Sequence, residues 1–304
     1  MISGLLSKII SETILSIIPS FIKSININFF DKYFIRFLIF VIISSFFVDY
    51  NVIKKYLFHL DGLILGFITI IHVMCSYRGY ELLKGGVANS IFYLYPIFIL
   101  FLSNYQFKWV YLILIIGLIL LALGNVQNEL KNENFDTENY QNNDKNNSTQ
   151  ENNKNIFVKD QTIERYHYEG IINMLVASIT EALIYFYVLK IKTDNSWNHL
   201  FISYFIGLLL ISVYYYKKLV TFQINNKIIV TGLFYIFILL IGYYLRFYAI
   251  NHLNIYYYVL LSYLGIILTY INGFIFLGEK INMYNIGGTG CIILGNFLLK
   301  FYNI

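Results

Sequence analysis

The sequence predicts an all-α integral membrane protein with ten transmembrane helices in two inverted five-helix repeats. Three observations predict it. The chain of 304 residues is 58% hydrophobic and only 13% charged, whereas soluble domains are about a quarter charged. Apolar stretches of about 20 residues, the length that crosses a bilayer, recur along nearly the whole chain. Short patterns of the first half also return, in the same order, in the second half.

The ten expected spans form two groups of five. Segments of strictly alternating polarity, which would indicate a closed barrel, do not occur. The first span is the weakest because it contains Lys8, Glu12 and Pro19. The spans cover residues 3–22, 34–50, 61–83, 86–104 and 108–126 in the first half, and 168–190, 199–216, 228–250, 255–277 and 283–301 in the second.

A polar, Asn-rich segment separates the two groups. It contains "NELKNENFDTENYQNNDKNNSTQENNKN" and is nearly free of aliphatic residues. Such a segment cannot bury enough apolar surface to fold, so we expect a disordered linker. The chain is thus divided into a first five-helix repeat at 1–126, a linker at 127–166 and a second five-helix repeat at 167–304.

Residues of one half recur in the other at a nearly constant offset. Arg78 aligns with Arg246, and Glu12 aligns with Glu181. Because five is odd, the second repeat must be inverted relative to the first, and both chain ends must lie on the same side of the membrane. Inverted repeats are a recurrent plan of secondary transporters, which bind their substrate between the repeats near the midplane.

Two segments resemble the EamA-type repeats of the drug/metabolite transporter superfamily. They read "GGVANSIFYLYPIFILFLS" and "SYLGIILTYINGFIFLGEKINMYNIGGTGCIILGN". "LGEK" at 277–280, followed by a Gly-rich helix, is the most specific piece, and the resemblance covers nearly all of the chain outside the linker. It implies cytosolic termini and a cavity between the first, third, fourth, sixth, eighth and ninth helices. The Lys-Arg pair of sugar-phosphate translocators and the "FYNN" and "GALNK" motifs of nucleotide-sugar carriers are absent, so the substrate stays open.

Two acidic residues, Glu12 and Glu181, lie inside apolar spans. An ionised carboxylate that faces lipid at this depth costs about 3 kcal/mol, so both should face the bundle interior or water. There they would bind a cationic group of a solute, carry a proton, or hydrogen-bond across helices as structural groups. The sequence leaves these roles open.

Two arginines, Arg246 and Arg78, lie in the final third of their spans. Either side chain could extend to the headgroup region, and Arg78 can pair with Glu81 three residues on. Arg246 has no such local partner. We therefore expect an unpaired Arg246 guanidinium beside the cavity, where it would bind a carboxylate or phosphate.

Three further residues complete the candidate substrate-binding set. His72 lies mid-span, where it would relay protons or make a structural hydrogen bond. Tyr257 belongs to a run of three tyrosines that would anchor its helix at the membrane interface or line the pocket mouth. Asn89 aligns with Tyr257 between the repeats and would be a polar pocket residue.

The predicted function is secondary active transport or exchange of a small polar metabolite by alternating access. An intramembrane enzyme or a channel-like protein is the alternative. No nucleophile motif, metal-ligand cluster or filter loop occurs in the sequence, so we expect no catalysis, cofactor or metal. No ATP-binding motif occurs either, so a gradient or exchange would supply the energy.

The expected partners are a small-molecule substrate and a lipid bilayer. No basic block indicates nucleic-acid binding. Gly287, Cys291 and Gly295 form a stripe of small residues on the last span, which would serve packing within the protomer or a homodimer contact. The sequence does not indicate which membrane holds the protein.

Overall fold

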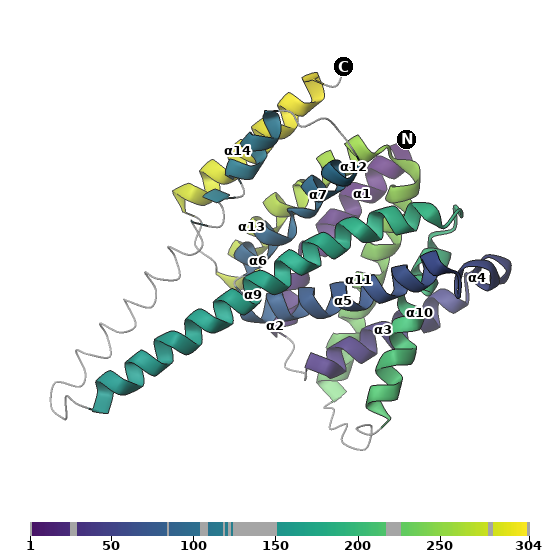
Figure 1. Cartoon of the computed structure of the whole chain (residues 1–304), viewed down its shortest axis with the longest axis horizontal. Helices are drawn as coiled ribbons and strands as arrows, with labels where there is room; N and C mark the ends of the chain where they lie inside the picture. Colours follow the sequence, from purple (N-terminus) through teal and green to yellow (C-terminus); the bar gives the residue numbers. More distant parts are fainter. Residues whose placement is uncertain are drawn as a thin grey trace.

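The computed structural model (Figure 1) describes residues 2–24, 29–83, 85–103, 109–117, 119–120, 123, 151–216, 226–278 and 282–302. All regular elements in these ranges are helices, so the predicted all-α fold is confirmed. They are α1 (Ile2–Leu15), α2 (Ile18–Ser24), α3 (Phe29–Ser45), α4 (Tyr50–Tyr56), α5 (Leu60–Leu82), α6 (Gly85–Phe92), α7 (Tyr95–Leu102), α9 (Glu151–Lys190), α10 (Ser196–Tyr215), α11 (Asn226–His252), α12 (Ile255–Ser262), α13 (Leu264–Leu277) and α14 (Met283–Tyr302).

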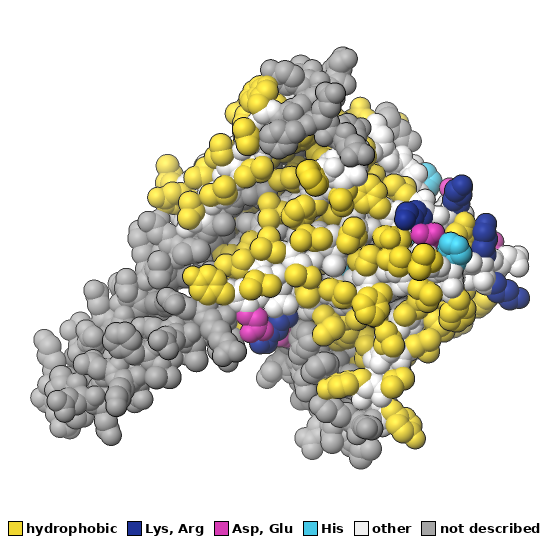
Figure 2. Space-filling model, in the orientation of Figure 1, with side chains coloured by type: hydrophobic (Ala, Val, Ile, Leu, Met, Phe, Trp, Pro, Cys, Tyr) yellow, Lys and Arg dark blue, Asp and Glu magenta, His cyan; other side chains and the backbone are white. Residues whose placement is uncertain are grey.

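Seven stretches of the described chain are long and apolar enough to cross a membrane, and they coincide with seven of the ten predicted spans. The protein is therefore an integral multi-pass membrane protein. Hydrophobic side chains cover most of the described part of the face shown in Figure 2, between one group of charged side chains near α4 and another near α2. The seven stretches are Ile2–Lys23, Leu60–Leu82, Gly85–Leu102, Tyr168–Lys190, Ser196–Tyr214, Gly232–His252 and Ile255–Phe276.

The other three predicted spans are not among these seven. The span predicted at 34–50 corresponds to α3, which starts earlier, at Phe29, and ends at Ser45. It ends before residue 50 because Asp49 already caps α4, accepting a hydrogen bond from the Asn51 backbone N–H at 2.9 Å. The span at 283–301 coincides with α14. The span at 108–126 lies partly outside the described residues. The count of ten helices thus remains a prediction.

The helix α9 begins at Glu151, inside the segment predicted to be a linker. Its first turns contain Glu, Lys, Gln and Arg, which are good helix formers. This part of the predicted linker is therefore helical in the structure. Residues 127–150 lie outside the described residues, and the linker and the domain boundaries stay predictions there.

Helices of one half pack against helices of the other half, and the contacts come in pairs that correspond between the repeats. The first helix of each half packs on the third helix of the other, because α1 contacts α11 and α9 contacts α5. The two second helices, α3 and α10, pack on each other. The half-helices of the fourth spans also cross over, α6 with α13 and α7 with α12. Exchanging the halves therefore reproduces the contacts, as an internal duplication requires.

Three spans are interrupted near their middle. The first is interrupted between α1 and α2, just before Pro19, and the fourth between α6 and α7, just before Pro96. Proline lacks the N–H that continues a helix, and its ring clashes with the preceding turn. The third interruption, between α12 and α13, falls at Tyr263 without a proline. All three bring irregular backbone into the interior of the bundle.

Neighbouring side chains satisfy the polar groups at the first interruption. The Asn272 amide donates to the Ser16 hydroxyl at 2.8 Å, and that hydroxyl donates to the Thr13 carbonyl at 2.7 Å. Such pairing is necessary because the hydrocarbon core of a bilayer offers no water to an interrupted helix. Asn272 lies on α13, so the interruption in the first span is hydrogen-bonded to the second half of the chain.

Glycines allow helices to pack closely in the described chain. A Cβ atom built on Gly66 of α5 would lie 2.9 Å from the Ile206 side chain of α10, so only glycine allows this approach. On α14, Gly295 packs against Leu114, whereas no described atom lies within 4 Å of a Cβ built on Gly287. Gly295 thus serves packing within the protomer, and the homodimer contact stays a prediction.

Candidate functional site

Four charged side chains meet in the interior of the bundle, and we call Lys8, Glu12, Glu181 and Arg246 the charge cluster. The Lys8 ammonium lies 2.6 Å from Glu12 Oε1, and Arg246 Nη2 lies 3.2 Å from the same oxygen. Arg246 Nη1 lies 2.5 Å from Glu181 Oε1. The four side chains are between 0% and 3% exposed. Two cations and two carboxylates in their ordinary ionised forms leave no net charge.

The charge cluster joins the two halves of the chain. Glu12 comes from α1, Glu181 from α9 and Arg246 from α11. Glu12 and Glu181 are the two carboxylates paired by the repeat, and both bind the same guanidinium. The expectation that Arg246 is unpaired is therefore wrong, because its partners lie far away in sequence. Pairing offsets the high cost of burying each charge.

Phenol groups complete the surroundings of the first carboxylate. The Tyr93 hydroxyl donates to Glu12 Oε2 at 2.7 Å, and the Tyr95 hydroxyl contacts Oε1 at 3.4 Å. The Lys8 ammonium lies 3.7 Å from the centroid of the Tyr258 ring, a cation–π contact. Both oxygens of Glu12 are thus held by donors, and the carboxylate is fixed in one orientation.

A glycine makes room for this carboxylate. Gly265 lies in the first turn of α13, directly after the third interruption. A Cβ atom built there would collide with the Tyr93 hydroxyl and would lie 2.6 Å from Glu12 Oε2. The missing side chain therefore allows α13 to approach the charge cluster.

His72 links the charge cluster to the third predicted span. Its Nδ1 lies 3.1 Å from the Ala177 carbonyl oxygen, so this nitrogen carries the proton. Its Nε2 lies 3.4 Å from both the Tyr243 hydroxyl and Glu181 Oε2. Glu181 Oε2 accepts no hydrogen bond from the described residues. With the proton on Nδ1, His72 Nε2 and Glu181 Oε2 face each other as two acceptors. One added proton, shared between these two atoms, would turn their contact into a hydrogen bond.

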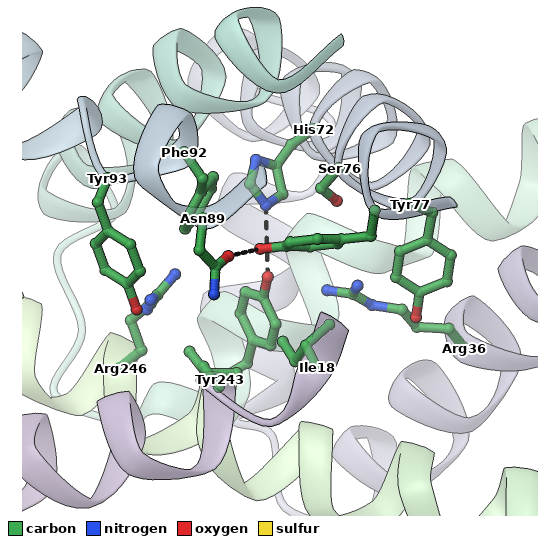
Figure 3. A pocket seen from close by; sticks show the side chains of 12 residues that line it. Ile18, Arg36, His72, Ser76, Tyr77, Asn89, Phe92, Tyr93, Tyr243 and Arg246 are labelled. Atoms are coloured by element: carbon green, nitrogen blue, oxygen red, sulfur yellow. Dashed lines mark hydrogen bonds between the residues drawn. The ribbon is translucent and has the colours of Figure 1, made fainter. Parts of the chain in front are cut away.

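A narrow pocket lies beside the charge cluster (Figure 3). Its free volume is about 10 Å³, close to the space of one water molecule. Three predicted site residues, His72, Asn89 and Arg246, line it, and Glu12 and Glu181 bind Arg246 directly. The lining residues are Leu15, Ile18, Arg36, His72, Ser76, Tyr77, Tyr80, Asn89, Phe92, Tyr93, Tyr243 and Arg246.

Asn89 fixes one wall of the pocket. It accepts a hydrogen bond from the Tyr80 hydroxyl at 2.5 Å, and its amide donates to the Thr269 hydroxyl at 2.6 Å. It is 2% exposed. The two bonds connect α5 and α13 through α6, and Asn89 lines the pocket, whereas its alignment partner Tyr257 does not.

Two predicted site residues do not reach the pocket. Arg78 is 37% exposed and pairs with Glu169 at 2.8 Å, while Glu81 is farther, at 3.9 Å. The side chain of Tyr257 does not line the pocket either; the next residue, Tyr258, faces the charge cluster instead. Helical geometry turns adjacent residues about 100° apart, so only one tyrosine of the run can face this direction.

Sequence reasoning missed several residues of the site. Arg36 falls inside the predicted span at 34–50 but was not among the candidate site residues; it lies in α3 and is 1% exposed. The signal was available, because an arginine inside "FIRFLIFVII" has to be buried or reach an interface. Lys8 had a comparable signal, since it lies one helical turn before Glu12. The missed tyrosines are Tyr77, Tyr80, Tyr93, Tyr95, Tyr243 and Tyr258.

Comparison with protein families gives a match over residues 168–301, to the EamA-like transporter family. The matched residues all lie in the second half of the chain. The resemblance to the drug/metabolite transporter superfamily is thereby confirmed. A comparison with curated proteins found no match. Glu181 and Arg246 lie inside the matched region, whereas Lys8, Glu12 and Arg36 lie before it, so both halves of the chain build the site.

Proposed function

We propose that this EamA-type protein is a secondary active transporter or exchanger that moves a small polar metabolite by alternating access. The observation that carries the proposal is the charge cluster, which is buried, built by both halves and adjacent to a pocket. Ionisable groups inside a membrane bundle mark substrate or ion pathways. Binding between two repeats is the plan of many secondary transporters.

The shared ion pairs supply a means of coupling binding to movement. Arg246 binds Glu12 and Glu181 at once. If the two halves move apart, one of these pairs must break, and a charged group of the solute replaces the lost partner. Partner exchange keeps the energies of the two arrangements similar, which a protein that alternates between them requires.

The structure corresponds to a closed arrangement in this scheme. A free volume of about 10 Å³ holds one water molecule rather than a metabolite, so solute entry requires helices to separate. The three interruptions provide places for this movement, because half-helices joined by irregular backbone can tilt independently. Two of the interrupted spans supply pocket residues, and the third carries Tyr258, which contacts Lys8 of the charge cluster.

A proton held between His72 and Glu181 is the coupling ion that we propose. The pair lies at 3.4 Å and touches Arg246 through Glu181. Protonation of Glu181 would weaken its hold on Arg246, so proton binding and release of the guanidinium would be linked. Solute binding to the released guanidinium would then depend on the proton.

Counterflow in proteoliposomes tests the proposal. The purified chain is reconstituted with unlabelled solute inside, and labelled amino acids, purines, phosphorylated sugars or organic cations are added outside. We expect transient accumulation of one labelled class, saturating with concentration and accelerated by solute on the opposite side. Empty liposomes are the control for leakage.

Three outcomes would contradict this function. Flux that neither saturates nor responds to solute on the opposite side would indicate a channel. Chemical conversion of a solute would indicate an enzyme. No counterflow with any of the four classes, by a protein that is folded and inserted, would remove the support for a metabolite carrier.

A further inference from the structure

Arg36 is a second guanidinium of the pocket and lies outside the charge cluster. It is 1% exposed, and its Nη2 donates to the Tyr204 hydroxyl at 2.6 Å. Its Nε has no acceptor among the described residues. In the same ranges, no carboxylate forms an ion pair with Arg36, whereas Arg246 has two. Arg36 is therefore a buried charge without a described counterion.

Aromatic rings surround this guanidinium without neutralising it. Its central carbon lies 4.7 Å from the centroid of Tyr243 and between 5.3 and 5.4 Å from the centroids of Phe40, Tyr77 and Tyr204. Ring faces attract a cation through their quadrupole but carry no charge. Since the charge cluster is neutral in its ordinary ionised forms, Arg36 leaves an excess positive charge at this end of the pocket.

We propose that Arg36 is an anion-binding site for the carboxylate or phosphate of the transported solute. This inference rests on the proposed function and narrows its substrate class to small organic anions and zwitterions. A buried guanidinium offers a planar fork that suits both oxyanions. An anion supplied by the solute would provide the counterion that the described residues do not.

The end of the pocket opposite Arg36, at Arg246, fits the rest of such a solute. Figure 3 shows Arg36 and Arg246 on opposite sides, with His72 and Tyr243 between them. A cationic group of a zwitterion would face the carboxylates that bind Arg246, while its anionic group reaches Arg36. The aromatic rings between the two ends would contact an apolar body. Arg36 comes from the second span, which the family resemblance did not place around the cavity.

Ligand-dependent thermal unfolding of the purified chain in detergent tests this site without measuring transport. The probes are benzoate, phenyl phosphate and neutral benzamide, and the variants are Arg36→Gln, Arg36→Lys and the matched control Arg78→Gln. We expect benzoate or phenyl phosphate to raise the unfolding temperature of the parental chain and of Arg78→Gln. Benzamide should not. Arg36→Gln should raise the apparent Kd of the anion at least about tenfold, because the variant loses a charged hydrogen bond to it.

The two anions separate the carboxylate from the phosphate as the preferred group. Equal stabilisation by benzamide and benzoate, or no stabilisation by either anion, overturns the site. So does an Arg36→Gln variant that binds the anion as the parental chain does. If that variant does not fold, the Arg36→Lys variant is the test. Weaker anion binding by this variant supports binding by the guanidinium fork, and anion binding with the parental affinity overturns it.

Counterflow separates failure of this site from failure of the proposed function. Anion binding through Arg36 in a chain that moves no solute supports the site and removes the transport proposal. Counterflow that is unchanged in a folded Arg36→Gln variant supports transport and overturns the site.

Discussion

Two groups of charges with the same composition lie in different parts of the molecule. The charge cluster has two cations and two carboxylates, all at most 3% exposed. The second group, which we call the boundary cluster, consists of Lys32, Arg78, Glu81 and Glu169. Its side chains are between 12% and 39% exposed. Both groups join helices from distant parts of the chain, so only the surroundings distinguish them.

The difference teaches how burial changes the consequence of removing one charge. An exposed pair contributes about 0–1 kcal/mol, because water replaces a lost partner. A buried pair that loses one member leaves an uncompensated charge, which destabilises by about 3–5 kcal/mol. The shortest contact is similar in the two groups, at 2.5 Å for Arg246 and 2.8 Å for Arg78. Distance alone therefore does not distinguish a structural surface pair from a buried site.

The largest effect is expected from Arg246→Met. The change leaves Glu12 and Glu181 buried without their shared cation, although Lys8 still pairs with Glu12. We expect loss of counterflow and destabilisation by about 3–5 kcal/mol. Arg78→Met is the matched control and should cost about 1 kcal/mol or less. Thermal unfolding in detergent measures both, and equal losses in the two variants would remove the distinction between the clusters.

A smaller effect is expected from Glu181→Gln, which should reduce transport more than Arg78→Lys. The amide keeps an oxygen that can accept from Arg246, and Glu12 still pairs with that arginine, so membrane insertion should stay intact. Loss of a charged hydrogen bond of about 1.5–3 kcal/mol predicts an initial rate at least about tenfold lower. Arg78→Lys keeps its charge beside Glu169 and should transport at nearly the parental rate.

Two transport regimes assign the role of Glu181. If this carboxylate carries the coupling proton, Glu181→Gln should keep solute exchange but lose accumulation driven by a pH gradient. If it binds a cationic group of the solute, exchange should fail as well. Parental rates in both regimes would leave Glu181 as an interhelical hydrogen bonder.

Gly265→Ala should act at the charge cluster without changing any charge. The new methyl group would collide with the Tyr93 hydroxyl and approach Glu12. Overpacking of this kind costs about 1–3 kcal/mol, and we expect a severalfold lower counterflow rate. Tyr93→Phe removes the colliding hydroxyl, so the double variant should recover part of the stability. A double variant as unstable as the sum of the single changes would show that the collision lies elsewhere.

The smallest effect is expected from deletion of residues 128–150. This stretch is polar and Asn-rich, and it precedes the start of α9 at Glu151. Because the sequence predicts a disordered connection here, and the length of such a connection changes stability only weakly, counterflow should stay within about twofold of the parental rate. A deletion that reaches the membrane but does not transport would assign the segment a role in the cycle.

Several expectations about individual residues came from local rules of the sequence. Glu12, Glu181, His72 and Arg246 stand out because each interrupts an apolar stretch. The structure places all four in or beside the pocket. Arg78 satisfies the same rule but lies at the boundary, since its position in the span lets it reach Glu169. A polar residue in a span is thus a marker of burial or of an interface, and the sequence does not separate the two.

The sequence by itself determined that the protein is helical and crosses a membrane, because hydropathy is summed over neighbouring residues. It also indicated which charges require partners. Only the tertiary structure decided which residues are the partners of these charges. Arg246 and Glu12 are 234 positions apart, and no local pattern connects them. Arg36 shows the same limit: its place in an apolar helix is local information, but its contacts with Tyr204 and Tyr243 exist only because α3 packs between helices of the other half.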